Sequence, residues 1–250
     1  MLGESTRAGE VTQRGFSLVE VVVVLMILGL LTWLVSGTYG GAAGAGDREM
    51  AKARGKTVQE AIRAFALNNG RLPCPDPAGS GWEGDCAAGM QMGWAPYRSL
   101  GLEQPADRDR FAYGVYRNAA ANADLAVRTE RTGDAVGDMH YQDIRDLMVG
   151  VQLAQAQVVS NGFLYMTGDG AALGAVDCAA NLVAHPAFVL IAPLEDRDGD
   201  GSRFDGVQAG LPATGLCVQS AATAASSAQD DVVLSEGLSS LMGWLSARAS

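Results

Sequence analysis

The apolar positions of the chain are concentrated near its N-terminus. Residues 16–35 read FSLVEVVVVLMILGLLTWLV, and between Gly15 and Asp47 the only charged side chain is Glu20. A helix of about 20 predominantly apolar residues is long enough to cross the hydrocarbon core of a bilayer. We therefore predict a membrane-spanning and assembly helix over residues 16–35.

A glycine-rich segment follows this apolar run. Residues 36–46 read SGTYGGAAGAG, in which five of eleven residues are glycine. Each glycine weakens a helix by about 1 kcal/mol relative to alanine. We predict a flexible joint here, either as a bendable stretch of helix or as a plain linker between an anchor and a domain.

Helical periodicity resumes after the joint, over residues 47–70. Four apolar residues recur there at the spacing of one helical face, namely Val58, Ala61, Ile62 and Phe65. The sequence Asn-Asn-Gly at 68–70, with three prolines close behind it, ends the helix. We predict an amphipathic helix whose apolar stripe packs on a sheet.

Short elements are predicted for the remainder, residues 71–250. Apolar side chains alternate in RFAYGVYR at 110–117, as in a strand, and AFVLIA at 187–192 is typical of a buried strand. Residues 143–159 favour a helix, and Ser235 is placed to cap a short amphipathic helix after it. The predicted fold class is α+β: a long N-terminal helix, membrane-spanning in its first half and amphipathic in its second, packed on an antiparallel sheet domain.

Composition and charge narrow the classes of function. The chain has 250 residues, of which 48% are hydrophobic, so it can form one large domain with an extension. A net charge of −10 argues against general binding of nucleic acid or anionic lipid, because both favour a basic surface. The sequence contains no Gly-x-Ser-x-Gly, His-Glu-x-x-His or phosphate-loop motif. We therefore expect a protein that is not an enzyme.

Glu20 is the one charged residue of the apolar run. An ionisable group inside a spanning helix is unfavourable by about 2.5–3.5 kcal/mol on insertion scales and usually marks function by pairing with another group. Cleavage between Gly15 and Phe16 would create an α-amino group four residues before Glu20, on the same helical face. The carboxylate can then neutralise the amine of a neighbouring subunit. Two alternatives stay open: a glutamate that reaches water at the membrane boundary, and ordinary signal cleavage near Ala43 or Ala45.

Residues 14–20, RGFSLVE, together with the apolar run, resemble the class III signal of type IV prepilins and type II secretion pseudopilins. The resemblance implies that a prepilin peptidase removes a leader, residues 1–15, by cutting after Gly15 and methylates the new amine of Phe16. It also implies that Glu20 guides subunit docking. The leader carries two arginines and two glutamates, so its side chains sum to zero, whereas many leaders of the family are basic.

This resemblance implies a structural subunit, a minor pilin or pseudopilin, of a type IV pilus-like filament or type II secretion pseudopilus. Its expected partners are other subunits, the peptidase, an inner-membrane assembly platform and, before assembly, the lipid bilayer. The expected location is a single pass in the inner membrane with the C-terminal domain outside, then a periplasmic or cell-surface filament. The alternative is a membrane-anchored extracytoplasmic binding domain that does not polymerise.

Four cysteines lie beyond the apolar run, and an even number on the expected extracytoplasmic side favours disulfides. They are Cys74, Cys86, Cys178 and Cys217. Three pairings are possible. We favour Cys74 with Cys86 and Cys178 with Cys217, because the first pair closes a short loop rich in proline and glycine. A loop of that size gains about 3 kcal/mol in the chain-entropy model. Zinc is disfavoured, because there is no Cys-x-x-Cys pair and only two histidines.

Calcium is the one candidate cofactor. Asp196, Asp198 and Asp200, followed by glycine, reproduce the opening of an EF-hand-like loop, in which alternate oxygens converge on the ion. The position that should carry a bidentate glutamate is Val207, so a site would need Asp205 or a remote ligand. The alternative is an acidic surface turn.

Overall fold

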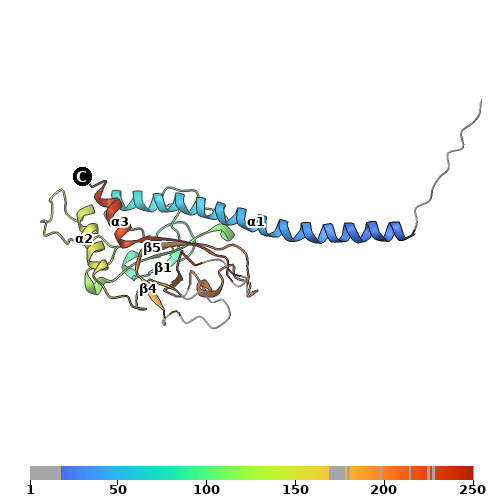
Figure 1. Ribbon diagram of the computed structural model, residues 1–250. Helices are drawn as coiled ribbons and strands as arrows, with labels where there is room; N and C mark the ends of the chain where they lie inside the picture. The colour runs from blue at the N-terminus through green and yellow to red at the C-terminus, as the bar shows by residue number, and fades with distance from the viewer. Residues whose placement is uncertain are drawn as a thin grey trace, which may run out of the picture. The chain divides into compact units, whose positions relative to one another are not determined.

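The structure is a computed structural model that describes residues 18–168, 178, 181–197, 199–213, 215–223, 226 and 229–249, with backbone alone for residues 34–45. Its longest element is helix α1, Leu18–Asn69, drawn in blue to cyan in Figure 1. The chain divides into two compact units, Met1–Gly46 and Asp47–Ser250. The predicted leader cleavage site, Gly15 and Phe16, lies outside the described residues.

The first part of α1 carries an apolar surface. Every side chain over residues 18–33 is exposed, and Glu20 lies in the first turn of the helix. Among the residues that the structure describes, none of the helices combines the length and apolar character that crossing a membrane requires. The membrane-spanning half of the predicted helix therefore stays a prediction. The backbone remains helical through residues 36–46, and bending at these glycines also stays a prediction.

The second part of α1 buries one face. Val58 and Ile62 are buried, which confirms the predicted stripe, while Ala61 and Phe65 lie half-buried beside it. Ala51 and Ala66 complete the face. This stripe shares one hydrophobic core with side chains of the sheet, as the sequence predicted.

The main sheet has four antiparallel strands in the order β1-β2-β5-β7. The strands are β1 Met92–Trp94, β2 Ala112–Val115, β5 Pro186–Ala192 and β7 Val232–Gly237. Strands β2 and β5 are buried along their whole length, which confirms the strand predictions at both places. Alternate residues of these two strands belong to two different core clusters, because both faces of the sheet are covered.

A second sheet contributes Val218 to a core cluster that contains no residue of α1. It has the order β4-β3-β6, with β3 antiparallel to β4 and parallel to β6. The strands are β3 Tyr165–Thr167, β4 Leu182–Ala184 and β6 Cys217–Gln219. Short 3-10 helices in the connections are η1 Cys86–Ala88, η2 Asp107–Asp109, η3 Ala119–Ala121 and η4 Gly206–Gln208.

Two further helices complete the α+β domain and pack against each other (Figure 1). Helix α2, Ile144–Gln155, begins at a capping box formed by Asp143 and Asp146, close to the predicted start. Helix α3, Leu238–Ser246, follows β7 directly. The prediction that Ser235 caps this helix is wrong. Ser235 pairs with β5 inside β7, because the apolar residues before it extend the sheet up to the helix.

A polar network joins α1, β7 and α3 inside this domain. The side chain of Glu236 has no exposed surface. Its Oε2 accepts hydrogen bonds from Arg63 Nη2 at 2.7 Å and Gln59 Nε2 at 2.7 Å, and its Oε1 accepts one from Ser240 Oγ at 2.5 Å. A buried carboxylate with both oxygens bonded and a cationic partner is compensated for its lost hydration.

Candidate functional site

The exposed surface of α1 is the first candidate site. Leu18 is 81% exposed and Trp33 is 78% exposed, and the side chains between them are exposed too. Contiguous apolar surface on this scale marks contact with lipid or another protein chain. Glu20 is its one charged group in the described residues. A carboxylate in the first turn is favoured by the positive end of the helix dipole. Its distance from the amine of Phe16 is untested, because Phe16 lies outside the described residues.

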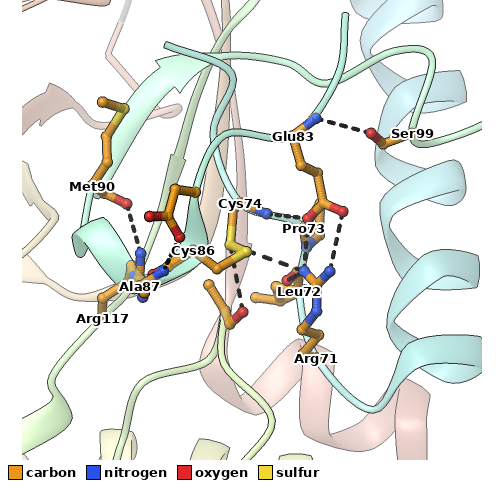
Figure 2. Close-up of a disulfide and its surroundings, with 12 residues drawn as sticks. Arg71, Leu72, Pro73, Cys74, Glu83, Cys86, Ala87, Met90, Ser99 and Arg117 are labelled. Atoms are coloured by element: carbon orange, nitrogen blue, oxygen red, sulfur yellow. Dashed lines mark hydrogen bonds and ion pairs between the residues drawn. A yellow bond between two sulfur atoms is a disulfide. The ribbon is translucent and has the colours of Figure 1, made fainter.

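The first disulfide fixes the loop that follows α1. Cys74 is bonded to Cys86, which is the pairing that the sequence favoured. Arg71 donates to both oxygens of Glu83, at 2.6 and 3.1 Å, and Glu83 Oε1 accepts the backbone N–H of Cys74 at 2.6 Å (Figure 2). Charge-assisted bonds of this kind are stronger than neutral ones. The ion pair and the disulfide therefore restrain the same backbone.

Arg117 holds the other end of that loop. Its guanidinium donates to the carbonyl oxygens of Cys86, at 2.5 Å, and Met90, at 3.2 Å (Figure 2). The same side chain pairs with Asp124 at 2.8 Å, and both charged groups are largely buried. The loop between the two cysteines is thereby anchored to strand β2, which Arg117 follows in the chain.

The second disulfide joins Cys178 to Cys217, again as the sequence favoured. Cys217 opens strand β6. This bond ties the connection after β3 to the second sheet.

In the predicted calcium loop, carboxylates accept hydrogen bonds from backbone N–H groups of the loop itself. Asp196 Oδ1 accepts the N–H of Gly199 at 2.7 Å, and its Oδ2 accepts that of Gly201 at 3.0 Å. Asp200 Oδ1 accepts the N–H of Ser202 at 2.7 Å. Asp198 lies outside the described residues. Among the residues that the structure does describe, neither Asp196 nor Asp200 joins a cluster with the geometry of a metal site.

Asp205 instead meets two residues that the sequence analysis did not name, Asp230 and Asp231. One carboxylate oxygen from each lies within 4.8 Å of the others. Asp205 has no exposed surface, and the other two are 6% and 5% exposed. We call these three residues the acidic trio. The available signal was the Asp-Asp pair directly before the apolar residues of β7, but its partner lies 25 positions earlier in the chain.

Asp231 is a member of the acidic trio with one hydrogen-bonded oxygen and one that accepts no hydrogen bond. Its Oδ2 accepts the N–H of Asp205 at 3.1 Å, whereas its buried Oδ1 accepts no hydrogen bond. Burial raises the pKa of Asp231 to about 8, the charges of Asp205 and Asp230 act in the same direction, and the backbone N–H groups of Asp205 and Leu194 act against it. An orphaned buried carboxylate oxygen beside two other carboxylates is the environment that a cation relieves.

The dimensions of the acidic trio suit a hard cation with oxygen ligands. Calcium binds oxygen at about 2.3–2.6 Å, so two ligands on opposite sides of one ion lie about 4.6–5.2 Å apart. One oxygen from each member of the acidic trio lies within 4.8 Å of the others, so three carboxylates can reach one such ion. Asp205, Asp230 and Asp231 would hold the ion, and its charge would offset theirs.

A long helix with an exposed apolar first part, continued into an antiparallel sheet domain, defines a pilin-like protein. Residues 12–36 match the family model of the prokaryotic N-terminal methylation motif. Type II secretion system core protein G of Xanthomonas campestris pv. campestris is 30% identical over 113 residues, which cover 42% of this chain and 77% of that protein. No solved structure matches the chain. The chain belongs to the family of type IV pilins and type II secretion pseudopilins.

Proposed function

We propose that the protein is a structural filament subunit, a minor pilin or pseudopilin, and not an enzyme. Prepilin peptidase cuts it after Gly15 and methylates Phe16. The subunit is held in the inner membrane by the first part of α1, with its domain on the extracytoplasmic side. An inner-membrane assembly platform then transfers it to a periplasmic or cell-surface filament of other pilin or pseudopilin subunits.

The observation that carries this proposal is the exposed apolar surface of residues 18–33, which contains one acid. Lipid can cover the apolar side chains of a simple anchor, but the hydrocarbon core of a bilayer offers Glu20 no cationic partner. Another subunit can offer its terminal amine. Repeated contacts of this head-to-tail kind generate a filament when the rotation between subunits does not close a ring.

The test is incorporation of Glu20→Val into filaments, together with mass spectrometry of the mature N-terminus. We expect a wild-type chain that begins with methylated Phe16, and a Glu20→Val chain that inserts in the membrane normally but is absent from sheared filaments. Glu49→Val is the matched control, because Glu49 is an exposed glutamate of the same helix that pairs locally with Lys52. Normal incorporation of Glu20→Val, or a mature chain that begins near Ala45, would contradict the proposal.

A second function of the domain is calcium binding by the acidic trio. It is supported by the buried Oδ1 of Asp231, which accepts no hydrogen bond. A ligand present at 100 times its dissociation constant stabilises the folded state by about 2.7 kcal/mol. Calcium added to chelator-treated protein should therefore raise the unfolding temperature of the wild type and leave that of Asp231→Asn unchanged. Equal shifts in both proteins would place the binding elsewhere.

A further inference from the structure

Arg197 contacts two members of the acidic trio from one position. Its Nε donates to Asp230 Oδ2 at 2.7 Å, and its backbone N–H donates to Asp205 Oδ1 at 3.0 Å. Its Nη2 also lies 2.9 Å from an oxygen of Glu195. The guanidinium therefore bridges a buried acid and an acid that faces the solvent.

Both oxygens of Asp230 accept a hydrogen bond in this arrangement. Its Oδ1 accepts the backbone N–H of Glu195 at 3.2 Å, while its Oδ2 is bound to the guanidinium of Arg197. The side chain of Asp230 is 7% exposed, and that of Arg197 is 38% exposed. Of the two partners, the arginine is the one that can leave, because its far end already reaches solvent.

We propose that the guanidinium of Arg197 is a built-in competitor of the calcium ion: it neutralises Asp230 in the metal-free protein and is displaced from it when the ion binds. This inference rests on the calcium function proposed above. A guanidinium at 2.7 Å from Asp230 Oδ2 and a divalent cation on the same carboxylate would repel each other strongly, so the two states exclude one another.

Glu195 can hold the guanidinium of Arg197 after it has left Asp230. Its side chain is 62% exposed, and it already holds Nη2 of Arg197. Rotation of the arginine side chain outward breaks the contact with Asp230 and keeps the contact with Glu195. The backbone N–H of Arg197 stays on Asp205, so the exchange needs no change in the path of the chain.

The competition should lower calcium affinity by the free energy of one partly exposed ion pair. Such a pair corresponds to a factor of up to about five in an equilibrium constant. Removal of the guanidinium in Arg197→Gln should therefore tighten calcium binding about threefold to fivefold. The same variant should be less stable than the wild type in chelator, because Asp230 then loses its counter-charge while buried. A purely structural role for Arg197 predicts the loss of stability without the gain in affinity.

The experiment is calorimetric titration of calcium into the full chain in detergent, with unfolding measured in chelator and in calcium. Arg203→Gln is the matched control, because it removes the same charge from the same loop while its Nη1 donates to the carbonyl of Arg108. We expect tighter binding in Arg197→Gln and less than a twofold change in Arg203→Gln. Unchanged or weaker binding in Arg197→Gln, with a wild type that binds calcium, overturns the competition alone. If neither the wild type nor Arg197→Gln binds calcium, the calcium function and the competition both fail, and the filament function is unaffected.

Discussion

At the scale of single residues, the buried carboxylates of this domain differ in their hydrogen bonds and in their counter-charges. Glu236 has hydrogen bonds on both oxygens and Arg63 as its cation, so its charge is compensated. Asp231 accepts a hydrogen bond on Oδ2 but none on Oδ1, makes no ion pair within the described part of the chain, and lies beside two more acids. A network that is fully satisfied stabilises a unique packing, whereas one that is not points to a missing partner. This contrast is why we regard Glu236 as structural and propose the acidic trio as a ligand site.

Glu130 gives a prediction for acid stability. Its Oε1 accepts the backbone N–H groups of Thr132, Gly133 and Asp134 at 2.7, 2.6 and 3.1 Å. Burial raises the pKa of Glu130, but these hydrogen bonds outweigh it and lower the pKa from 4.5 to about 2. A lowered pKa contributes stability above the unfolded value, and that stability disappears as pH falls through the folded value. Wild type should therefore be more stable than Glu130→Gln at pH 6, and the difference should shrink between about pH 4.5 and 2.

Denaturant unfolding at a series of pH values measures this difference. Glu103→Gln serves as control, since Glu103 is an exposed glutamate. Its difference from wild type should stay flat over the same range. A constant gap between wild type and Glu130→Gln would show that the loop does not hold the carboxylate in its charged form.

At the scale of elements, Gly55 sets how closely α1 approaches β7. A Cβ added at Gly55 would lie 2.6 Å from Cδ1 and 3.0 Å from Cδ2 of Leu234. Alanine requires a small movement of a flexible leucine and gains about 1 kcal/mol of helix propensity, so Gly55→Ala should be nearly neutral. The branched side chain of Gly55→Val should destabilise the domain by about 1–3 kcal/mol through overpacking.

A double-mutant cycle with Leu234→Ala tests that explanation. Because the cavity left by Leu234→Ala accepts the new side chain, the two changes together should be less destabilising than their sum. Gly46→Val is the control on the same helix, since a Cβ there meets nothing within 4 Å. Its effect should stay within about 0.5 kcal/mol. Strict additivity at Gly55 and Leu234 would mean that the two residues do not compete for space.

The elements predicted from sequence are those whose signal is local. The stripe of α1, the buried run of β5 and the helix predicted over residues 143–159 each lie within one segment, so local sequence patterns found them. Strands of three residues, such as β3 and β6, are too short for a pattern and exist through pairing with distant residues. The acidic trio was missed for the same reason, because only the folded chain brings Asp205 to Asp230.

At the scale of the whole molecule, folding and assembly belong to different parts of the chain. Within the described residues, every member of the three core clusters lies between Ala51 and Leu245, and both disulfides lie beyond Gly70. The exposed apolar surface of residues 18–33 contributes nothing to that core. A unit that holds its own core can fold alone.

Residues 47–250 expressed alone in an oxidising compartment should therefore be a folded monomer. In one detergent buffer, its thermal midpoint should lie within about 4 °C of that of the full chain, the shift that about 1 kcal/mol gives a domain of this size. Without detergent, the full chain should associate, because its apolar helix surface then meets only water or other copies. Light scattering after size exclusion separates the two forms. A truncated chain that unfolds or aggregates would show that the domain depends on residues before 47. If both forms associate to the same extent, the contact surface does not lie in the first part of α1.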